Sequence, residues 1–265
     1  DLSNFDTSNV TMMFGMFSGC SSLSNLNLSN FNTKSLLNMH SMFNGCSNLT
    51  SLNLSNFDTS LVTTMESMFY NCTKLPTIDL SNFNTARVKS FRIIFYKCSE
   101  LAEINLSNFD TSSATSLYGM FYGCLNLTSI DVSNFNTKNV ETMDYLFRNC
   151  SKLTSLDISN FNTTKVKTIH YIFAFCTIIQ KINLGKLDTS SVEDMRGLFY
   201  YNENKTRNKN NNLNSYINEG KDWKDFKLID KRRKLTKDEE GYFNYLPLMN
   251  PEGNQNSKDE DDIYA

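Results

Sequence analysis

The sequence predicts an α/β solenoid whose repeated units place a parallel sheet on an inner face and short helices on an outer face. Phenylalanine recurs at two positions of a 26-residue repeat, and all seven cysteines keep the same step. A fixed period between about 20 and 50 residues is typical of chains whose units bury their apolar faces against their neighbours. The three series are Phe5, Phe31, Phe57, Phe83, Phe109, Phe135 and Phe161; Phe17, Phe43, Phe69, Phe95, Phe121, Phe147, Phe173 and Phe199; and Cys20, Cys46, Cys72, Cys98, Cys124, Cys150 and Cys176.

The first part of each unit has the pattern of a strand. In the unit that begins at Leu23, Leu26 and Leu28 alternate with polar residues. Alternation with a period of two predicts a short strand with one buried face. Stacked units would place these strands side by side in one parallel sheet, with about 4.8 Å between neighbours.

The second part of each unit has the pattern of a helix. Leu36, Met39 and Met42 recur at steps of three residues, and Phe43 follows directly. Apolar residues at steps of three and four predict a helix of about three turns.

The residues at the two ends of this segment support the same interpretation. Pairs such as Asp58-Thr59 precede the apolar segment, where a side-chain oxygen can cap a helix. Glycine or asparagine stands before most cysteines, where a left-handed residue can end a helix. Lys97 and Phe175 occupy this position in two units, and we expect their turns to be strained or differently built.

At these residues the chain resembles a known family. The spacing L-x-x-L-x-L resembles a leucine-rich repeat, and the signature LSNFDTS-x-V-x-x-M-x-x-MF-x-x-C-x-x-L is similar to the repeat of BspA-like surface proteins. The resemblance implies a right-handed leucine-rich-repeat solenoid. It also implies an exported protein, on the cell surface or secreted, that acts in binding or adhesion.

We expect four regions along the chain. Residues 1–201 would form about seven and a half units, beginning inside a repeat of a longer parent protein. Residues 202–212 are polar and predict a linker. Residues 213–249 contain apolar side chains, and a C-terminal cap is one interpretation of them. Residues 250–265 have the composition of a disordered tail.

Composition and motifs argue against several classes of function. A formal charge of −2 gives no overall attraction to nucleic acid, and no run of 18 apolar residues suggests a membrane span. His40 and His170 lie five units apart, and no catalytic motif occurs, so we expect neither an enzyme nor a cofactor. A single position of the repeat explains the cysteines as a column of buried free thiols; disulfides and a metal site are the alternatives.

The helical segment carries the first candidate binding surface. Its side chains four residues apart would share a face and form a ridge of tyrosine and arginine, the types that dominate binding hot spots. Packing of these rings across neighbouring helices is the alternative interpretation. We use the name ridge for Arg92, Tyr96, Tyr118, Tyr122, Tyr145, Arg148 and Tyr171.

The strand segment carries the second candidate surface. Its exposed positions are small and polar, which suits a glycan or another repetitive ligand, and calcium binding to their oxygens is a further alternative. We use the name strand face for Asn53, Asp79, Glu103, Asn105, Asp131 and Asp157.

The predicted function is a non-enzymatic, surface-displayed repeat module that binds macromolecules in adhesion. Its partner would be a protein of a host or neighbouring cell, or a glycan, and not a nucleic acid. One alternative is a passive spacer of a larger surface protein. Another is an intracellular scaffold for protein interactions, which free thiols would favour. Ligand identity and oligomeric state do not follow from the sequence.

Overall fold

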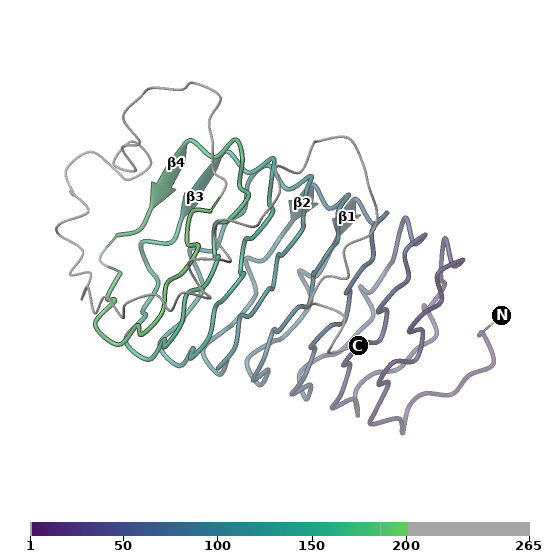
Figure 1. The fold of residues 1–265 in the computed structure, drawn as a ribbon. Helices are drawn as coiled ribbons and strands as arrows, with labels where there is room; N and C mark the ends of the chain where they lie inside the picture. The colour runs from purple at the N-terminus through teal and green to yellow at the C-terminus, as the bar shows by residue number, and fades with distance from the viewer. Residues whose placement is uncertain (1, 186, 201–265) are drawn as a thin grey trace, which may run out of the picture. The chain divides into compact units, whose positions relative to one another are not determined.

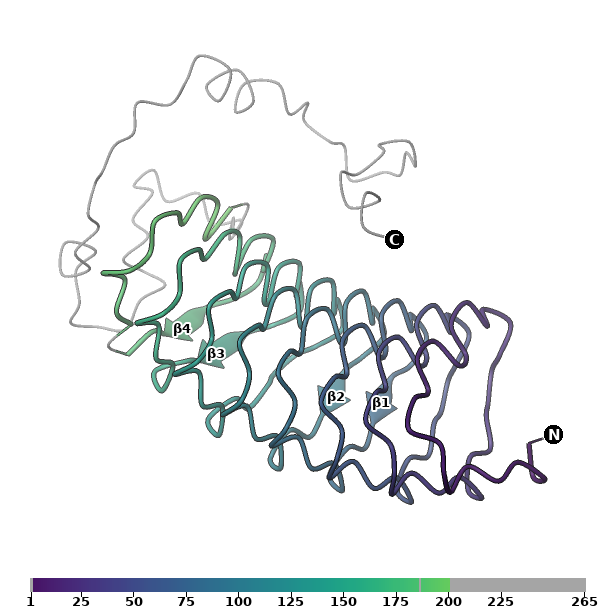
Figure 2. The ribbon, with the colours of Figure 1, turned by 90° about the horizontal axis from the view of Figure 1, so that it is seen from below.

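The computed structural model describes residues 2–185 and 187–200, which belong to one compact unit of the chain. Each stretch of 26 residues forms one turn of chain, which we call a coil, and successive coils lie side by side along a stack (Figures 1 and 2). The repeat of the sequence is therefore the repeat of the structure. The expected linker, cap and tail at 202–265 lie outside the described residues.

The predicted strands form in only part of the stack. β1 (Thr77–Ile78) pairs in parallel with β2 (Glu103–Ile104), and β3 (Ser155–Asp157) pairs in parallel with β4 (Lys181–Asn183). Paired residues are 26 apart, as in Leu156 with Ile182. Leu156 is buried between exposed neighbours, as period-two alternation predicts. The described residues thus hold two small parallel sheets instead of one continuous sheet.

The predicted outer helices are absent from the described residues, so an α/β solenoid with helices on its outer face is wrong. The segment taken for a helix is a pair of tight turns, which we call the double turn, at 117–124 and equivalent positions. The N–H groups of Leu117, Gly119 and Phe121 donate to carbonyls of the next coil at 2.8–3.0 Å. The N–H groups of Met120 and Tyr122 donate three residues back within the coil at 3.2 and 3.1 Å.

Positive φ angles exclude a helix at the double turn. Gly119 and Gly123 have φ of 56° and 71°, a region that a right-handed helix does not contain. The same two positions are positive in other coils, including Lys97 at 58° and Phe175 at 59°. The turns at Lys97 and Phe175 therefore have the same backbone conformation as the other turns, and the expectation that they are differently built is wrong. The double turn returns side chains to the interior at steps of three and four, and this spacing imitates a helix.

The core is a column of side chains that runs through the coils. Phe95, Phe121 and Phe147 are fully buried and stack in sequence, with centroids 5.6 and 5.7 Å apart. The cysteines extend this column: Cys124 Sγ, for example, donates to the carbonyl of Phe95 at 3.2 Å. The cysteines are free thiols, and all except Cys20 are buried, which confirms the expected column in six coils.

Two polar side-chain ladders also join the coils. Threonines at one position of each coil, such as Thr111, are buried and hydrogen-bond to the backbone of the next coil. The side-chain amide of Asn134 donates to the carbonyls of Leu106, Ser107 and Phe109 at 2.8, 3.1 and 2.9 Å. Such contacts compensate for the small amount of regular strand, because they satisfy backbone groups that would otherwise lack partners.

Candidate functional site: a surface of tyrosine and arginine

The ridge predicted from the sequence forms, but it lies on the double turns and not on helices. Its residues come from four consecutive coils and occupy three positions of the double turn. The contacts run without a break from Arg92, which lies 4.0 Å from the ring of Tyr118, to Tyr171, which stacks on Tyr145 at 5.7 Å. Tyr118 joins Tyr145 edge to face at 5.3 Å. All seven predicted residues are therefore connected.

A stack of three tyrosines forms one part of this surface. Tyr96 lies between Tyr70 at 4.9 Å and Tyr122 at 4.3 Å, with the ring planes within 12° of parallel. Tyr70 is not among the predicted ridge residues, although it shares its position in the repeat with Tyr96 and Tyr122. The repeat itself could have identified it. The stack covers both π faces of Tyr96 and one face each of Tyr70 and Tyr122.

Arg148 continues the position of the stacked tyrosines into the next coil, where four aromatic rings surround it. Its Cζ lies 5.1 Å from the centroid of Tyr122, 5.4 Å from Tyr145 and 5.4 Å from Tyr171. Phe175 completes the group at 5.5 Å. Each ring within about 6 Å attracts the guanidinium through its quadrupole. Arg148 Nε is buried and has no hydrogen-bond partner in the described part of the chain.

The sequence did not reveal this group because Phe175 was assigned to a helix end. A bulky residue at a turn position with positive φ is not expected from its type. Only the register between neighbouring coils brings Phe175 beside Arg148. The aromatic group around Arg148 could therefore be recognised only from the structure.

Both interpretations of the ridge are visible in its burial. Tyr96 is 6% exposed, and its contacts are those of core packing. The other six ridge residues remain partly exposed. Burial raises the pKa of Tyr145 to about 12, so its phenol stays neutral at any physiological pH. The ridge is thus partly buried by the packing of its own rings and partly exposed.

A charged cluster lies beside the ridge. The buried Asp144 accepts hydrogen bonds from the backbone N–H of His170 at 2.6 Å and from Thr168 Oγ1 at 2.7 Å. His170 Nε2 lies 3.0 Å from Asp194 Oδ2, and Arg196 Nε lies 2.8 Å from the same oxygen. Among residues 2–185 and 187–200, no three His, Cys, Asp or Glu side chains are arranged to hold a metal ion.

The strand face presents exposed side chains whose oxygens are partly used. Asp79, Asp131 and Asp157 each accept the N–H of the serine two residues later, at 2.9 Å. Hydrogen bonds from Ser133 and Ser159, the hydroxyl first and then the backbone N–H, lower the pKa of Asp131 and Asp157. The oxygens of Asn53 and Asn105 accept equivalent bonds, and Glu103 is exposed on β2. These side chains are turn-forming as well as surface residues.

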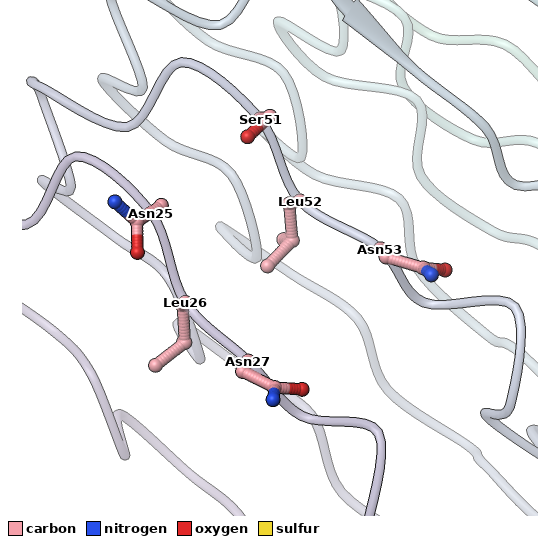
Figure 3. A pocket seen from close by; sticks show the side chains of 6 residues that line it. All are labelled: Asn25, Leu26, Asn27, Ser51, Leu52 and Asn53. Carbon is pink, nitrogen blue, oxygen red and sulfur yellow. The ribbon is translucent and has the colours of Figure 1, made fainter. Parts of the chain in front are cut away.

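A hollow of about 420 Å³ lies on the same side of the first coils. Asn27 and Asn53 come from neighbouring coils and point the same way along its edge (Figure 3). Leu26 and Leu52 lie between the polar side chains and pack on the core. The lining is Asn25, Leu26, Asn27, Ser51, Leu52 and Asn53. Its amide and hydroxyl groups could hydrogen-bond a polar ligand, but it contains no ionisable side chain.

A family model described as "Mycoplasma protein of unknown function, DUF285" matches residues 1–104 and 89–216 of this chain. The chain belongs to the DUF285 family. The two matched stretches together span the described coils of this DUF285 protein. No curated protein and no solved structure matches the chain.

Two further features describe this DUF285 chain. Burial raises the pKa of the Cys46 thiol to about 11 and those of Cys98 and Cys176 to about 12. A thiol held protonated is a poor nucleophile and a poor metal ligand. In the described part of the chain, no helix is long and apolar enough to span a bilayer.

Proposed function

We propose that this chain is a non-enzymatic binding module, displayed on a cell surface, that engages another macromolecule in adhesion through the ridge. The observation that carries the proposal is the unbroken contact chain of tyrosine and arginine from Arg92 to Tyr171, drawn from four coils. Tyrosine and arginine dominate the energetics of protein interfaces. The ring contacts already hold these side chains in place, so the ridge would lose little conformational entropy when a partner binds.

Two ridge tyrosines lie at a turn position that strains the backbone of any residue other than glycine. Ile93, Tyr145 and Tyr171 have φ of 48°, 60° and 51° at a turn position that is glycine in three other coils. A non-glycine residue in this region costs about 1–2 kcal/mol, and such strain tends to gather at functional sites. Ser41 and Ser67 take the same conformation, so the strain belongs to the turn position, and Tyr145 and Tyr171 are the ridge residues that carry it.

The cellular location follows from the resemblance to BspA-like surface proteins. The buried thiols are compatible with it. Six of the seven cysteines are buried and free, so an oxidising compartment would find only Cys20 accessible. Free thiols thus no longer favour an intracellular scaffold over a surface protein.

A protein partner fits the ridge better than a glycan. Sugars commonly stack on exposed ring faces, whereas the faces of Tyr96 and Tyr122 lie against each other at 4.3 Å. The strand face remains the alternative surface for a glycan, because its asparagines and aspartates offer hydrogen-bonding groups in a regular row.

The experiment measures binding of the full chain to cells, matrix proteins and glycans, with and without calcium. We expect saturable binding that weakens at least about tenfold in an Arg92→Ala, Tyr118→Ala, Tyr122→Ala variant, as for loss of hot-spot residues. The matched control is Asn53→Ala, Glu103→Ala, Asn105→Ala on the strand face. Thermal unfolding of each variant would show that its fold is kept.

Each other outcome points elsewhere. Loss of binding only in the strand-face variant would transfer the function to that surface and to a glycan. Equal binding by all three proteins would contradict the ridge. No binding at all would favour the passive spacer, which the ladders that join neighbouring coils would stiffen.

A further inference from the structure

The strand face and the ridge carry opposite charge. Asp79, Glu103, Asp131 and Asp157 are exposed on the strand face, with Lys181 as the one opposing charge among the described residues of those strand positions. Hydrogen bonds lower the pKa of each of these aspartates, so the three aspartates stay ionised to a lower pH than a free aspartate does.

The ridge and its turns carry the opposite sign. Arg92 and Lys97 lie on one double turn, Arg148 lies on the double turn two coils further on, and none of them forms an ion pair in the described part of the chain. The nearby carboxylate of Asp144 is buried and is engaged by His170 and Thr168. Within residues 2–185 and 187–200, these three partly exposed cations thus have no carboxylate partner.

The two charged rows share one spacing. Asp79 and Asp131 share one position of the repeat and lie two coils apart; Arg92 and Arg148 are also two coils apart along the stack, at turn positions four residues from each other. Neighbouring coils pair as parallel strands do, with about 4.8 Å between them, so both separations are roughly 10 Å along the stack. Charges at a given spacing pair best with charges of opposite sign at the same spacing. A second copy of this chain carries such charges.

We propose that the ridge of one copy binds the strand face of a second copy, so that the chains associate side by side. This inference rests on the proposed function, because it names the partner of the same ridge. The strand segment and the double turn are different parts of each coil, so one copy can use both surfaces at once. A contact between two different surfaces is heterologous and extends into an open assembly rather than a closed dimer.

The test is sedimentation velocity of the full chain at rising concentration in about 10 mM and about 1 M salt. The screening length is about 30 Å in the first and about 3 Å in the second, so we expect association in low salt that disappears in high salt. Arg92→Glu, Lys97→Glu should weaken association at least about tenfold, since like charges would then face each other. The matched control is Lys138→Glu, Lys152→Glu, which changes the net charge equally at exposed residues outside both surfaces.

A mixing experiment separates the contact from a folding defect. Glu103→Lys, Asp131→Lys reverses the strand face and should also stop association. Each reversed chain offers what the other lacks, so a mixture of the two should associate again. A monomeric wild type in low salt, an equal loss in the control variant, or a mixture that stays monomeric would overturn the inference. If the wild type is monomeric but the ridge variant loses binding to cells, the proposed function stands and the second copy is not its partner.

Discussion

Thr111 and Asn136, on neighbouring coils, exchange two hydrogen bonds through a single hydroxyl group. Thr111 Oγ1 donates to the carbonyl of Asn136 at 3.1 Å and accepts the N–H of the same residue at 2.8 Å. Thr111 is fully buried. One side chain therefore replaces the pair of strand hydrogen bonds that this part of the coil lacks, and the equivalent threonines repeat the arrangement along the stack.

Thr111→Val should destabilise the chain more than its small change in shape suggests. Valine fills the space but leaves the N–H and carbonyl of Asn136 without their partner. A buried unsatisfied group costs about 1–3 kcal/mol; because both bonds of Asn136 are only part-buried, we expect the lower part of that range for each, a loss of about 2–4 kcal/mol in the free energy of unfolding, measured by urea denaturation. Thr111→Ser keeps the hydroxyl and should lose about 1 kcal/mol, the value of one buried methyl group. Equal losses in the two variants would show that the hydroxyl contributes little.

Phe121→Ala should be among the most damaging single changes in the core. Its ring is fully buried between Phe95 and Phe147, at 5.6 and 5.7 Å. Removal of such a ring leaves a cavity, and we expect a loss of about 3–5 kcal/mol in the free energy of unfolding. Phe121→Leu fills most of the space and should lose about half as much. A shift below about 1 kcal/mol for alanine would contradict the assignment of this ring to the core.

Much of the interior could be predicted from the sequence. Phenylalanine and cysteine positions repeat in every coil, and a side chain needed in every unit is one that packs against its neighbours. The strand pattern described at Leu26 holds at the equivalent Leu156, which lies in β3, although the unit of Leu26 itself contains no strand. These predictions succeeded because they depend only on which residues face inward.

The outer segment and the aromatic group around Arg148 could not be predicted in the same way. Apolar spacing in steps of three and four arises equally from a helix and from two linked turns that return to the core. The glycines at Gly119 and Gly123, four residues apart, were the available signal, because positive φ at both positions is incompatible with a helix. Contacts such as Arg148 with Phe175 depend on the register between coils, which composition does not reveal.

Lys97 offers a test of the backbone assignment, because its φ is 58°. Lys97→Gly and Lys97→Ala remove the same ammonium group but differ in their tolerance of positive φ. At an ordinary position alanine is more stable than glycine by about 0.5–1 kcal/mol. Here the order should reverse, since alanine keeps a penalty of about 1–2 kcal/mol that glycine lacks. Urea denaturation of the two variants would measure the difference in their free energy of unfolding. If the alanine variant were the more stable, a left-handed residue at this turn would be contradicted.

The buried thiols predict a loss of stability in alkaline solution. Burial raises the pKa of Cys98 and Cys176 to about 12 and holds those of Cys124 and Cys150 well above their usual range. The folded chain therefore keeps these protons at a pH where the unfolded chain, with thiol pKa values of about 8.5, releases them. Stability is fully present below about pH 8.5 and falls above it, by about 1.4 kcal/mol per thiol for each further pH unit.

Urea denaturation between about pH 7 and pH 10 would measure this slope, with thiol labelling as a second readout. Labelling of the native chain at neutral pH should reach Cys20 alone, because the other six thiols are buried, and should reach all seven after unfolding. Cys124→Ala supplies the control: it should reduce the alkaline slope by the contribution of one thiol while the remaining thiols stay protected. A slope unchanged by this variant, or rapid labelling of several thiols in the native chain, would contradict a closed column of buried cysteines.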